Sequence, residues 1–506
     1  MGTVFNADII LRNGNKADFD PTKMRQGEPA VSVDTKQLFV GIGGGAVMEL
    51  ANAENIGTKR YGVRRAVASS SPVLERVGDA DGLTAAAGVG NAPATNDFDN
   101  IYPWSHMRRC NLADNGNVMA YEGDPTYASN GSNGQVMVEI PRFYQKHETV
   151  DGYEYWWVCE MPLGGFRLSP AFIGSSGQVL DKIYIAAYDA GYDGTSKATS
   201  VAGAHPEVRR TRTSFRTIAK ARGAGWQLLD IAMACDVMQF LFIVEFATLH
   251  CQYIMNGVVS LPYTDSHAAA FTELSANRIV ITNAQAAGYV VGQSIEIGTS
   301  QGGGQIAKGR VITEITPLAD GINTALVFDG EAVDVTQGNL VYSSGWVSGG
   351  ADGVVASSGS ATSNSSGKSP FKWRGIENAW GNVFQWIDGV NITDNQAWVS
   401  STPAEYDDTS VAAPYKKLNF KNGNEDGYVK TLGEDINYPW ARFPTEAGAS
   451  ATTYYSDYYY QSTGLRACGL GGNFNNGAYA GLFYFGCSLA ASVSTVTVGA
   501  RLSYKP

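Results

Sequence analysis

The sequence predicts an α+β protein made mainly of short strands and ordered loops. Of its 506 residues, 59 are Gly, 26 Tyr, 20 Phe and 10 Trp; aromatic residues favour strands, whereas glycine favours turns. Two longer stretches, 213–222 and 228–249, have the apolar spacing of helices. Because 44% of the residues are hydrophobic and only 17% are charged, the chain is expected to fold rather than stay disordered.

The net charge limits the classes of partner. The chain has 37 Lys and Arg against 48 Asp and Glu, a formal charge of −11. Binding to a phosphate backbone needs an excess of basic residues along one face. No nucleic-acid partner is therefore expected.

Residues 1–57 are predicted to form a small N-terminal β module. Strands are expected over 8–12, 30–33 and 37–40, with a turn at 34–36. The sequence GIGGGA at 41–46 matches a dinucleotide-binding pattern, but no βαβ unit continues after it, so a glycine-rich hairpin turn before a helix-like 47–51 is the better interpretation. A module of this size buries too little core to be stable alone, and we expect it to lean on a partner protein or on copies of itself.

Residues 58–275 are predicted to be the first part of a larger body. Strands are expected over 136–141, 153–159 and 182–188, because each stretch is aromatic or β-branched and is bounded by Gly, Asp or Pro.

The two helices of this body differ in character. The stretch 213–222 has one apolar side, whereas 228–249 is apolar nearly all round and is expected to be central to the core. Its charge-free part, 237–244, is too short to span a bilayer, so no membrane insertion is expected. The first residues lack the basic and apolar regions of a signal peptide, so no Sec export is expected.

The middle of the chain changes pattern. Residues 276–347 are predicted to form an inserted all-β domain, a barrel or sandwich of six short strands separated by turn residues. A Gly/Ser-rich linker, 348–370, leads back to the second part of the body, 371–506, where tryptophans are expected to anchor long loops.

The residue types that carry enzyme chemistry are present without the spacing that such chemistry needs. The six cysteines are scattered without a CxxC pair, and the five histidines stand isolated. Paired acids such as Asp407 with Asp408, and Glu425 with Asp426, lie in polar, turn-like sequence that favours a solvated loop over an acid/base pair. No metal, no cofactor and no catalytic residue is expected.

The most specific motif is WRGIENAWGNVFQWIDGVNI at 373–392. It resembles the core motif of the formylglycine-generating-enzyme branch of the C-type lectin fold and, more closely, a form found in phage and prophage tail proteins. The stretches 470–477 and 499–502 are similar to closing strands of that fold, and 27–41 is similar to the module with which many phage fibres begin. The resemblance implies a C-type lectin fold in which the following residues are structural: Trp380, Gly381, Asn382, Phe384 and Trp386.

The C-terminal region is similar to that of the variable proteins diversified by retroelements, the group of the phage tropism determinants. Adenine mutagenesis does not produce Lys, Glu, Gln, Met or Trp at its target positions, and none of the five occurs from 468 to 504. A terminal strand that never varied is the alternative. The resemblance implies receptor binding by Asn473, Phe474, Asn475, Tyr479, Phe483, Tyr484, Phe485, Ser488, Leu489, Ala490, Ser492, Val493, Ser494, Thr495, Val496 and Thr497.

A tyrosine-rich stretch precedes this region. Tyr and Ser at low charge density are typical of binding loops, because tyrosine gives a large rigid contact area at low entropic cost. The alternative is that several of these tyrosines are buried under the tryptophan loops. The accessory binding loop predicted here consists of Tyr454, Tyr455, Asp457, Tyr458, Tyr459 and Tyr460.

Together, these observations predict a phage or prophage virion-surface adhesin, not an enzyme. It is expected to be assembled in the host cytoplasm, to attach to other virion proteins through its N-terminal module, to form a homotrimer, and to bind a protein or glycan receptor on the bacterial surface. The alternatives are a structural head-fibre or baseplate decoration protein and a lectin-fold oxidoreductase.

Overall fold

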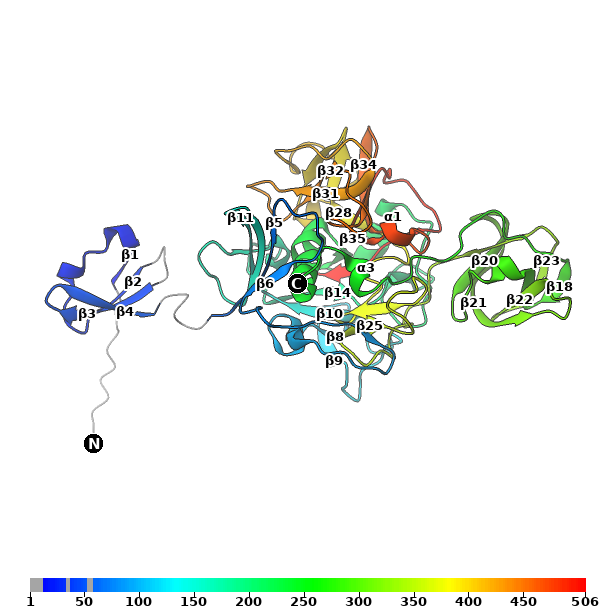
Figure 1. Ribbon diagram of the computed structural model, residues 1–506, viewed down its shortest axis with the longest axis horizontal. Coiled ribbons are helices and arrows are strands. Elements are labelled where there is room, and N and C mark those ends of the chain that lie inside the picture. The colour runs from blue at the N-terminus through cyan, green and yellow to red at the C-terminus, as the bar shows by residue number, and fades with distance from the viewer. Residues whose placement is uncertain (1–11, 33–36, 52–57) are drawn as a thin grey trace.

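Strands dominate this protein and form several separate sheets (Figure 1). The structure, a computed structural model, describes residues 12–32, 37–51 and 58–506. Strands make up 39% of it and helices 11%, so the predicted α+β class with a C-type lectin fold and a clearly inserted domain is wrong, and the protein is mostly β. The physical reason is that the two predicted helices are short, while aromatic and β-branched stretches pair as strands throughout the body.

The N-terminal module is a four-stranded sheet in the order β1-β2-β3-β4. The predicted glycine-rich hairpin is confirmed, because it joins β3 to β4, although 47–51 is strand rather than helix. Most of the strand predicted over 8–12, and the turn at 34–36, lie outside the described residues. The strands are β1 (Arg12–Gly14), β2 (Pro29–Ser32), β3 (Gln37–Gly43) and β4 (Ala46–Ala51).

Two sheets form the first half of the body. The six-stranded sheet contains β17 (Trp226–Leu228), β37 (Leu502–Tyr504), β14 (Lys182–Ala186), β10 (Gln135–Pro141), β8 (Arg108–Leu112) and β9 (Val118–Tyr121), in that order. The five-stranded sheet contains β13 (Arg167–Leu168), β11 (Tyr144–Val150), β12 (Tyr153–Cys159), β5 (Arg60–Ala66) and β6 (Glu75–Gly78). Since β37 is the last strand of the chain, the C-terminus is built into the first of these sheets.

The predicted core helix is present. A π-helical stretch, Met233–Gln239, runs into α2 (Phe240–Phe246), and all residues of both are buried. Its buried Glu245 accepts hydrogen bonds from Trp373 Nε1 at 2.8 Å and Arg374 Nε at 2.9 Å, which compensates the burial of the carboxylate. Among the described residues, no helix is long and apolar enough to cross a membrane.

Residues 278–343 contain a five-stranded sheet with a hydrophobic cluster of its own. Five of the six strands predicted here are present, and 289–291 is not a strand. The order is β19 (Arg278–Thr282), β22 (Asn323–Phe328), β21 (Gly303–Pro317), β20 (Ser294–Ser300) and β24 (Leu340–Ser343). The boundaries predicted for a separate domain stay predictions.

The Gly/Ser-rich stretch 348–370 is packed structure rather than a linker. Its strand β25 (Ser358–Ser360) pairs with β7 (Gly88–Val89) and with β26 (Phe371–Trp373), which in turn pairs with β27 (Ile376–Glu377). Ser358 and Ser360 are fully buried. Composition alone suggested flexibility, but small residues are also what a close backbone approach requires.

The largest sheet lies in the C-terminal part. Its main path runs β30 (Lys416–Lys417), β29 (Gln396–Val399), β28 (Phe384–Thr393), β34 (Leu465–Gly471), β35 (Gly481–Cys487), β33 (Tyr458–Gln461), β31 (Gly427–Gly433) and β32 (Phe443–Ala447), with β36 (Val498–Gly499) beside β28. The remaining helices are short: α1 (Arg212–Lys220), α3 (Cys251–Ile254) and α4 (Asn283–Ala286).

Candidate functional site

The motif at 373–392 lies in the core. Trp380 and Trp386 are fully buried, and Asn382, at a φ of 55°, donates from Nδ2 to Asp189 Oδ2 at 2.8 Å. Arg501, directly before β37, donates to the other oxygen of Asp189 at 2.8 Å and to the Glu377 and Asn378 carbonyl oxygens of the motif at 2.8 and 2.9 Å, so it joins the motif to the C-terminal end of the chain. Gly381 and Phe384 are buried as well. These five predicted structural residues therefore have no surface for a ligand.

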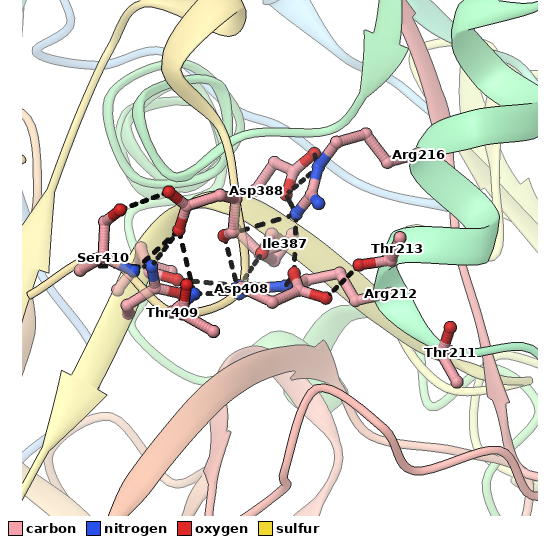
Figure 2. A network of polar contacts seen from close by, with 12 residues as sticks. Thr211, Arg212, Thr213, Arg216, Ile387, Asp388, Asp408, Thr409 and Ser410 are labelled. Carbon is pink, nitrogen blue, oxygen red and sulfur yellow. Dashed lines mark hydrogen bonds and ion pairs between the residues drawn. The ribbon is translucent and has the colours of Figure 1, made fainter.

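Helix α1 is bound to the largest sheet by charged side chains (Figure 2). Its N-terminus is capped by Thr211, whose side chain accepts from Ser214 N. Arg216 donates to Asp388 of β28 and, at 2.8 Å, to Asp408, and Arg212 donates to Asp408 at 2.8 Å. The prediction that Asp408 lies in a solvated loop is thus wrong, because its side chain is only 18% exposed.

The electrostatics of this network favour the charged carboxylate. Burial alone would raise the pKa of Asp408, but Arg212, Thr213 and Arg216 outweigh it and hold the pKa below its usual value. Since every member is a partner of another, the network fixes the position of α1 rather than offering a free group for chemistry.

The segment 488–497, the C-terminal loop, is held by its backbone. The amides of Ala467, Arg212, Arg209 and Phe384 donate to its carbonyl oxygens at residues 489, 491, 495 and 497, at 2.8 to 3.0 Å. The side chains of Ser492, Ser494 and Thr495 are exposed. Backbone anchoring is independent of side-chain identity, so the loop can change its exposed side chains without losing its position.

A shallow groove of about 350 Å³ runs beside this loop. Its walls come from the α1 N-terminus, the turn at 408–409, the start of β34 and the loop itself. The lining residues are Thr211, Thr213, Asp408, Thr409, Leu465, Arg466, Ala490, Ala491 and Ser492.

The strands next to this loop divide their tyrosines between two faces. Tyr428 of β31 is paired with Tyr458 of β33, and Tyr459 is paired with Phe485 of β35. Side chains alternate along a strand, so Tyr428, Tyr458 and Tyr460 share one face, while Tyr459 and Phe485 point into the main core. The first face is packed against a hydrophobic cluster that includes Phe384, Trp386 and Tyr484, and it is partly open to solvent.

Four half-buried tyrosines on this face are in ring contact, and we name them the tyrosine patch: Tyr428, Tyr458, Tyr460 and Tyr479. The Tyr458 ring centroid lies 4.2 Å from that of Tyr479, 4.7 Å from that of Tyr460 and 5.2 Å from that of Tyr428. Below them, Tyr484 packs on Phe384 at 5.1 Å. The rings pack against one another, and each remains partly exposed.

The polar surroundings of the patch are acidic. Burial raises the pKa of Tyr458 and Tyr460, and neighbouring tyrosines and the Asp426 carboxylate raise it further. Both hydroxyls are therefore neutral near pH 7 and available as hydrogen-bond donors and acceptors.

Six of the predicted receptor-binding residues are buried, and their assignment as contact residues is corrected. The causes are that β35 is buried on both faces, that the 473–474 turn is covered by residues 258–263, and that Val496 is buried in a cluster with Val208 and Val383. These residues are Asn473, Phe474, Phe483, Tyr484, Phe485 and Val496. The ten others are not buried: Asn475, Tyr479, Ser488, Leu489, Ala490, Ser492, Val493, Ser494, Thr495 and Thr497.

The residues of the predicted accessory loop also fall into buried and partly exposed groups. Tyr455, Asp457 and Tyr459 are buried, and Asp457 Oδ2 accepts from Phe483 N at 2.8 Å. Tyr454 lies away from the patch, under the Arg65 guanidinium at 5.7 Å. Only Tyr458 and Tyr460 of this group belong to the tyrosine patch.

Sequence reasoning missed Tyr428 as a site residue. It follows the acidic pair Glu425–Asp426 and a glycine, in a stretch without other aromatic residues. Its pairing with Tyr458 is a contact between distant segments, and period-two alternation in 427–433 was the only signal that could have pointed to its face.

Cys468 and Cys487, on neighbouring strands, bring their sulfur atoms to 3.6 Å, and both are free and buried. Spacing in the sequence had not suggested this proximity. Within residues 12–32, 37–51 and 58–506, no group of three or more His, Cys, Asp or Glu side chains is arranged to hold a metal ion.

Comparison with known proteins identifies no family for this chain. No protein-family model matches the sequence, and no curated protein does. Among solved structures, the chain is similar at 11% identity to the Major Tropism Determinant U1 variant, with 98% of each chain covered and a TM-score of 0.15. The P3c variant of the same protein gives 11% identity, coverage of 98% of this chain and 99% of that chain, and a TM-score of 0.14. TM-scores this low do not establish a shared fold.

Proposed function

We propose that this protein is a receptor-binding adhesin of a phage or prophage particle, and that it binds the bacterial surface through the tyrosine patch and the adjoining C-terminal loop. The observation that carries the proposal is the patch itself, four half-buried tyrosines in mutual contact. Tyrosines of this kind are over-represented at the energetic centres of protein interfaces.

The supporting structure suits a binding role. The patch stands on paired strands, and the loop beside it is anchored through carbonyl oxygens while its small side chains face solvent. A rigid base with changeable side chains allows affinity to change without refolding. The resemblance of residues 373–392 to phage and prophage tail proteins supports the particle context.

In this proposal the N-terminal module attaches the protein to other virion proteins and forms a homotrimer, and the particle is assembled in the host cytoplasm. Three copies of a weak contact would act together, because linked binding events raise the effective concentration of the second and third. The protein has no catalytic role and needs no cofactor.

The test is binding of the fluorescently labelled protein to a panel of bacterial strains, measured by flow cytometry. The double variant Tyr458→Ala/Tyr479→Ala is expected to bind its strain about tenfold more weakly or worse. The matched control is Tyr153→Ala, a half-buried tyrosine on strand β12 of another sheet, and it is expected to bind as the wild type does.

A purely structural decoration protein is the competing function. If no strain is bound, and electron microscopy of the particle places the patch against other virion proteins, the adhesin proposal is wrong. A patch that faces away from the particle, together with loss of binding in the double variant only, supports it.

A further inference from the structure

Three half-buried tyrosines elsewhere on this protein are each covered by one of its own arginines. The guanidinium carbon of Arg108 lies 3.5 Å from the Tyr121 ring centroid, that of Arg210 lies 4.3 Å from Tyr192, and that of Arg64 lies 4.6 Å from Tyr153. Within the described part of the chain, no Lys or Arg lies over a ring of the tyrosine patch. The patch thus lacks the kind of internal cation that covers those three rings.

A carboxylate stands at the edge of this surface. Gly427 is paired with Tyr459, so Asp426 comes opposite Tyr460, and its Oδ1 accepts from Gln461 N at 2.9 Å. Asp426 and the neighbouring Glu425 are exposed. Lys430, the next cation along β31, is engaged with Glu446 at 3.1 Å, so it does not neutralise this edge.

We propose that the tyrosine patch and Asp426 together bind arginine or lysine side chains on the surface of a protein partner. The proposal rests on the proposed function in that this partner is the bacterial receptor. A cation over a tyrosine face is attracted by the ring quadrupole, and a carboxylate beside the rings adds direct charge attraction. The same carboxylate repels phosphate and acidic sugars, which disfavours anionic glycans as the ligand.

The direct test uses purified protein and a fluorescently labelled hexa-arginine peptide, with hexaglutamate as the second probe, followed by fluorescence anisotropy. Hexa-arginine is expected to bind, more weakly as NaCl is raised, and hexaglutamate is not. Asp426→Lys is expected to weaken hexa-arginine binding by about fivefold.

The matched control is Asp81→Lys. Asp81 is exposed and precedes a glycine, as Asp426 does, and its replacement changes the net charge by the same amount. It is expected to change hexa-arginine binding by less than about 1.5-fold. An equal loss in both variants would mean that the peptide responds to net charge alone, and would overturn the proposal.

The role of the rings is tested with two variants at one position. Tyr458→Phe keeps the ring and is expected to bind hexa-arginine as the wild type does, whereas Tyr458→Ala is expected to bind about three- to fivefold more weakly. Thermal melting of each variant shows that it is folded. Equal binding by Tyr458→Ala and the wild type would overturn the proposal.

Binding to cells separates a protein partner from a glycan. Protease treatment of a bound strain is expected to abolish adhesion, whereas periodate oxidation of its glycans is not. Loss of adhesion after periodate alone would assign the patch to a glycan and overturn the inference. If the wild type binds no strain, the proposed function fails, and the peptide measurements still decide whether the patch prefers cations.

Discussion

Two aromatic surfaces on this protein differ in whether a cation of the same chain covers their rings. On β12, the side chains of Tyr153, Tyr155 and Trp157, which we name the β12 stripe, alternate onto one face. Tyr155 stacks on Trp157 at 5.8 Å, and Arg64 lies over Tyr153 and is ion-paired with Glu75 at 2.8 Å. The tyrosine patch has rings in similar contact but no cation of its own among the described residues. The β12 stripe therefore already has its cation from within the chain, which is why the proposal above assigns cation binding to the tyrosine patch and not to the stripe.

The two surfaces also differ in how tightly side chains and backbone pack around a glycine. In the β12 stripe, Trp157 covers its cross-strand neighbour Gly62, where an added Cβ would come within 2.3 Å of the ring. Beside the tyrosine patch, Gly486 faces Gly469, and an added Cβ would lie 3.2 Å from the Gly469 carbonyl oxygen. Both positions are closely packed, but the contact that a Cβ would make at Gly62 is much more severe than the one at Gly486.

The largest expected effect comes from filling these two glycine positions. Gly62→Ala should lower the free energy of unfolding by about 2–3 kcal/mol, because the indole of Trp157 must move. Gly486→Ala should cost less than about 1 kcal/mol, because a shift of a few tenths of an ångström relieves the contact. Urea unfolding measures both, and equal losses would contradict the difference in packing described above.

A smaller effect is expected from the network that holds α1 beside the C-terminal loop. Asp408→Asn should lower the free energy of unfolding at pH 7 by about 2 kcal/mol, because Arg212 and Arg216 lose their shared carboxylate. Since the pKa of Asp408 is lowered by folding, its contribution is present above about pH 4 and is lost as the pH falls below that value.

The variant should therefore lose less stability than the wild type between pH 5 and pH 3, as followed by thermal melting across that range. Asp81→Asn is the control, because Asp81 is exposed and belongs to no such network. Parallel pH profiles for the wild type and Asp408→Asn would contradict the assignment.

The smallest effect is expected from removing single hydroxyls. Tyr460→Phe should leave the free energy of unfolding within about 0.5 kcal/mol of the wild type, because the Tyr460 hydroxyl makes no hydrogen bond to another described residue. Tyr155→Phe should be similar, since its hydroxyl accepts only a long bond, 3.4 Å, from Arg64. A large loss in Tyr460→Phe would show that the patch is closed by a bond that the structure does not contain.

Local patterns predicted much of the secondary structure. The apolar run 228–249 contains a buried helix because no side of it is polar, and most of the β-branched stretches between 278 and 343 are strands. The stretch 348–370 is an exception, because its glycines and serines predict a linker although it contains a paired strand. Gly359 is needed where β25 approaches β7, because a Cβ there would lie 2.4 Å from the Gly88 carbonyl oxygen.

The site was predicted only in part. Period-two alternation separates Tyr458 and Tyr460 from Tyr459, but the sequence does not say which face is covered. That depends on β31, β35 and residue 479, which are distant in the chain. For the same reason, the sequence pattern does not place Phe483 and Phe485 in the core, where they lie in the structure.

The carbonyl anchoring of the C-terminal loop has a consequence for protein engineering. The four amides that hold it come from three separate segments of the chain, and the oxygens that they bind exist whichever amino acids occupy the loop. Ser492, Ser494 and Thr495 are therefore suitable positions for a combinatorial library displayed on this framework.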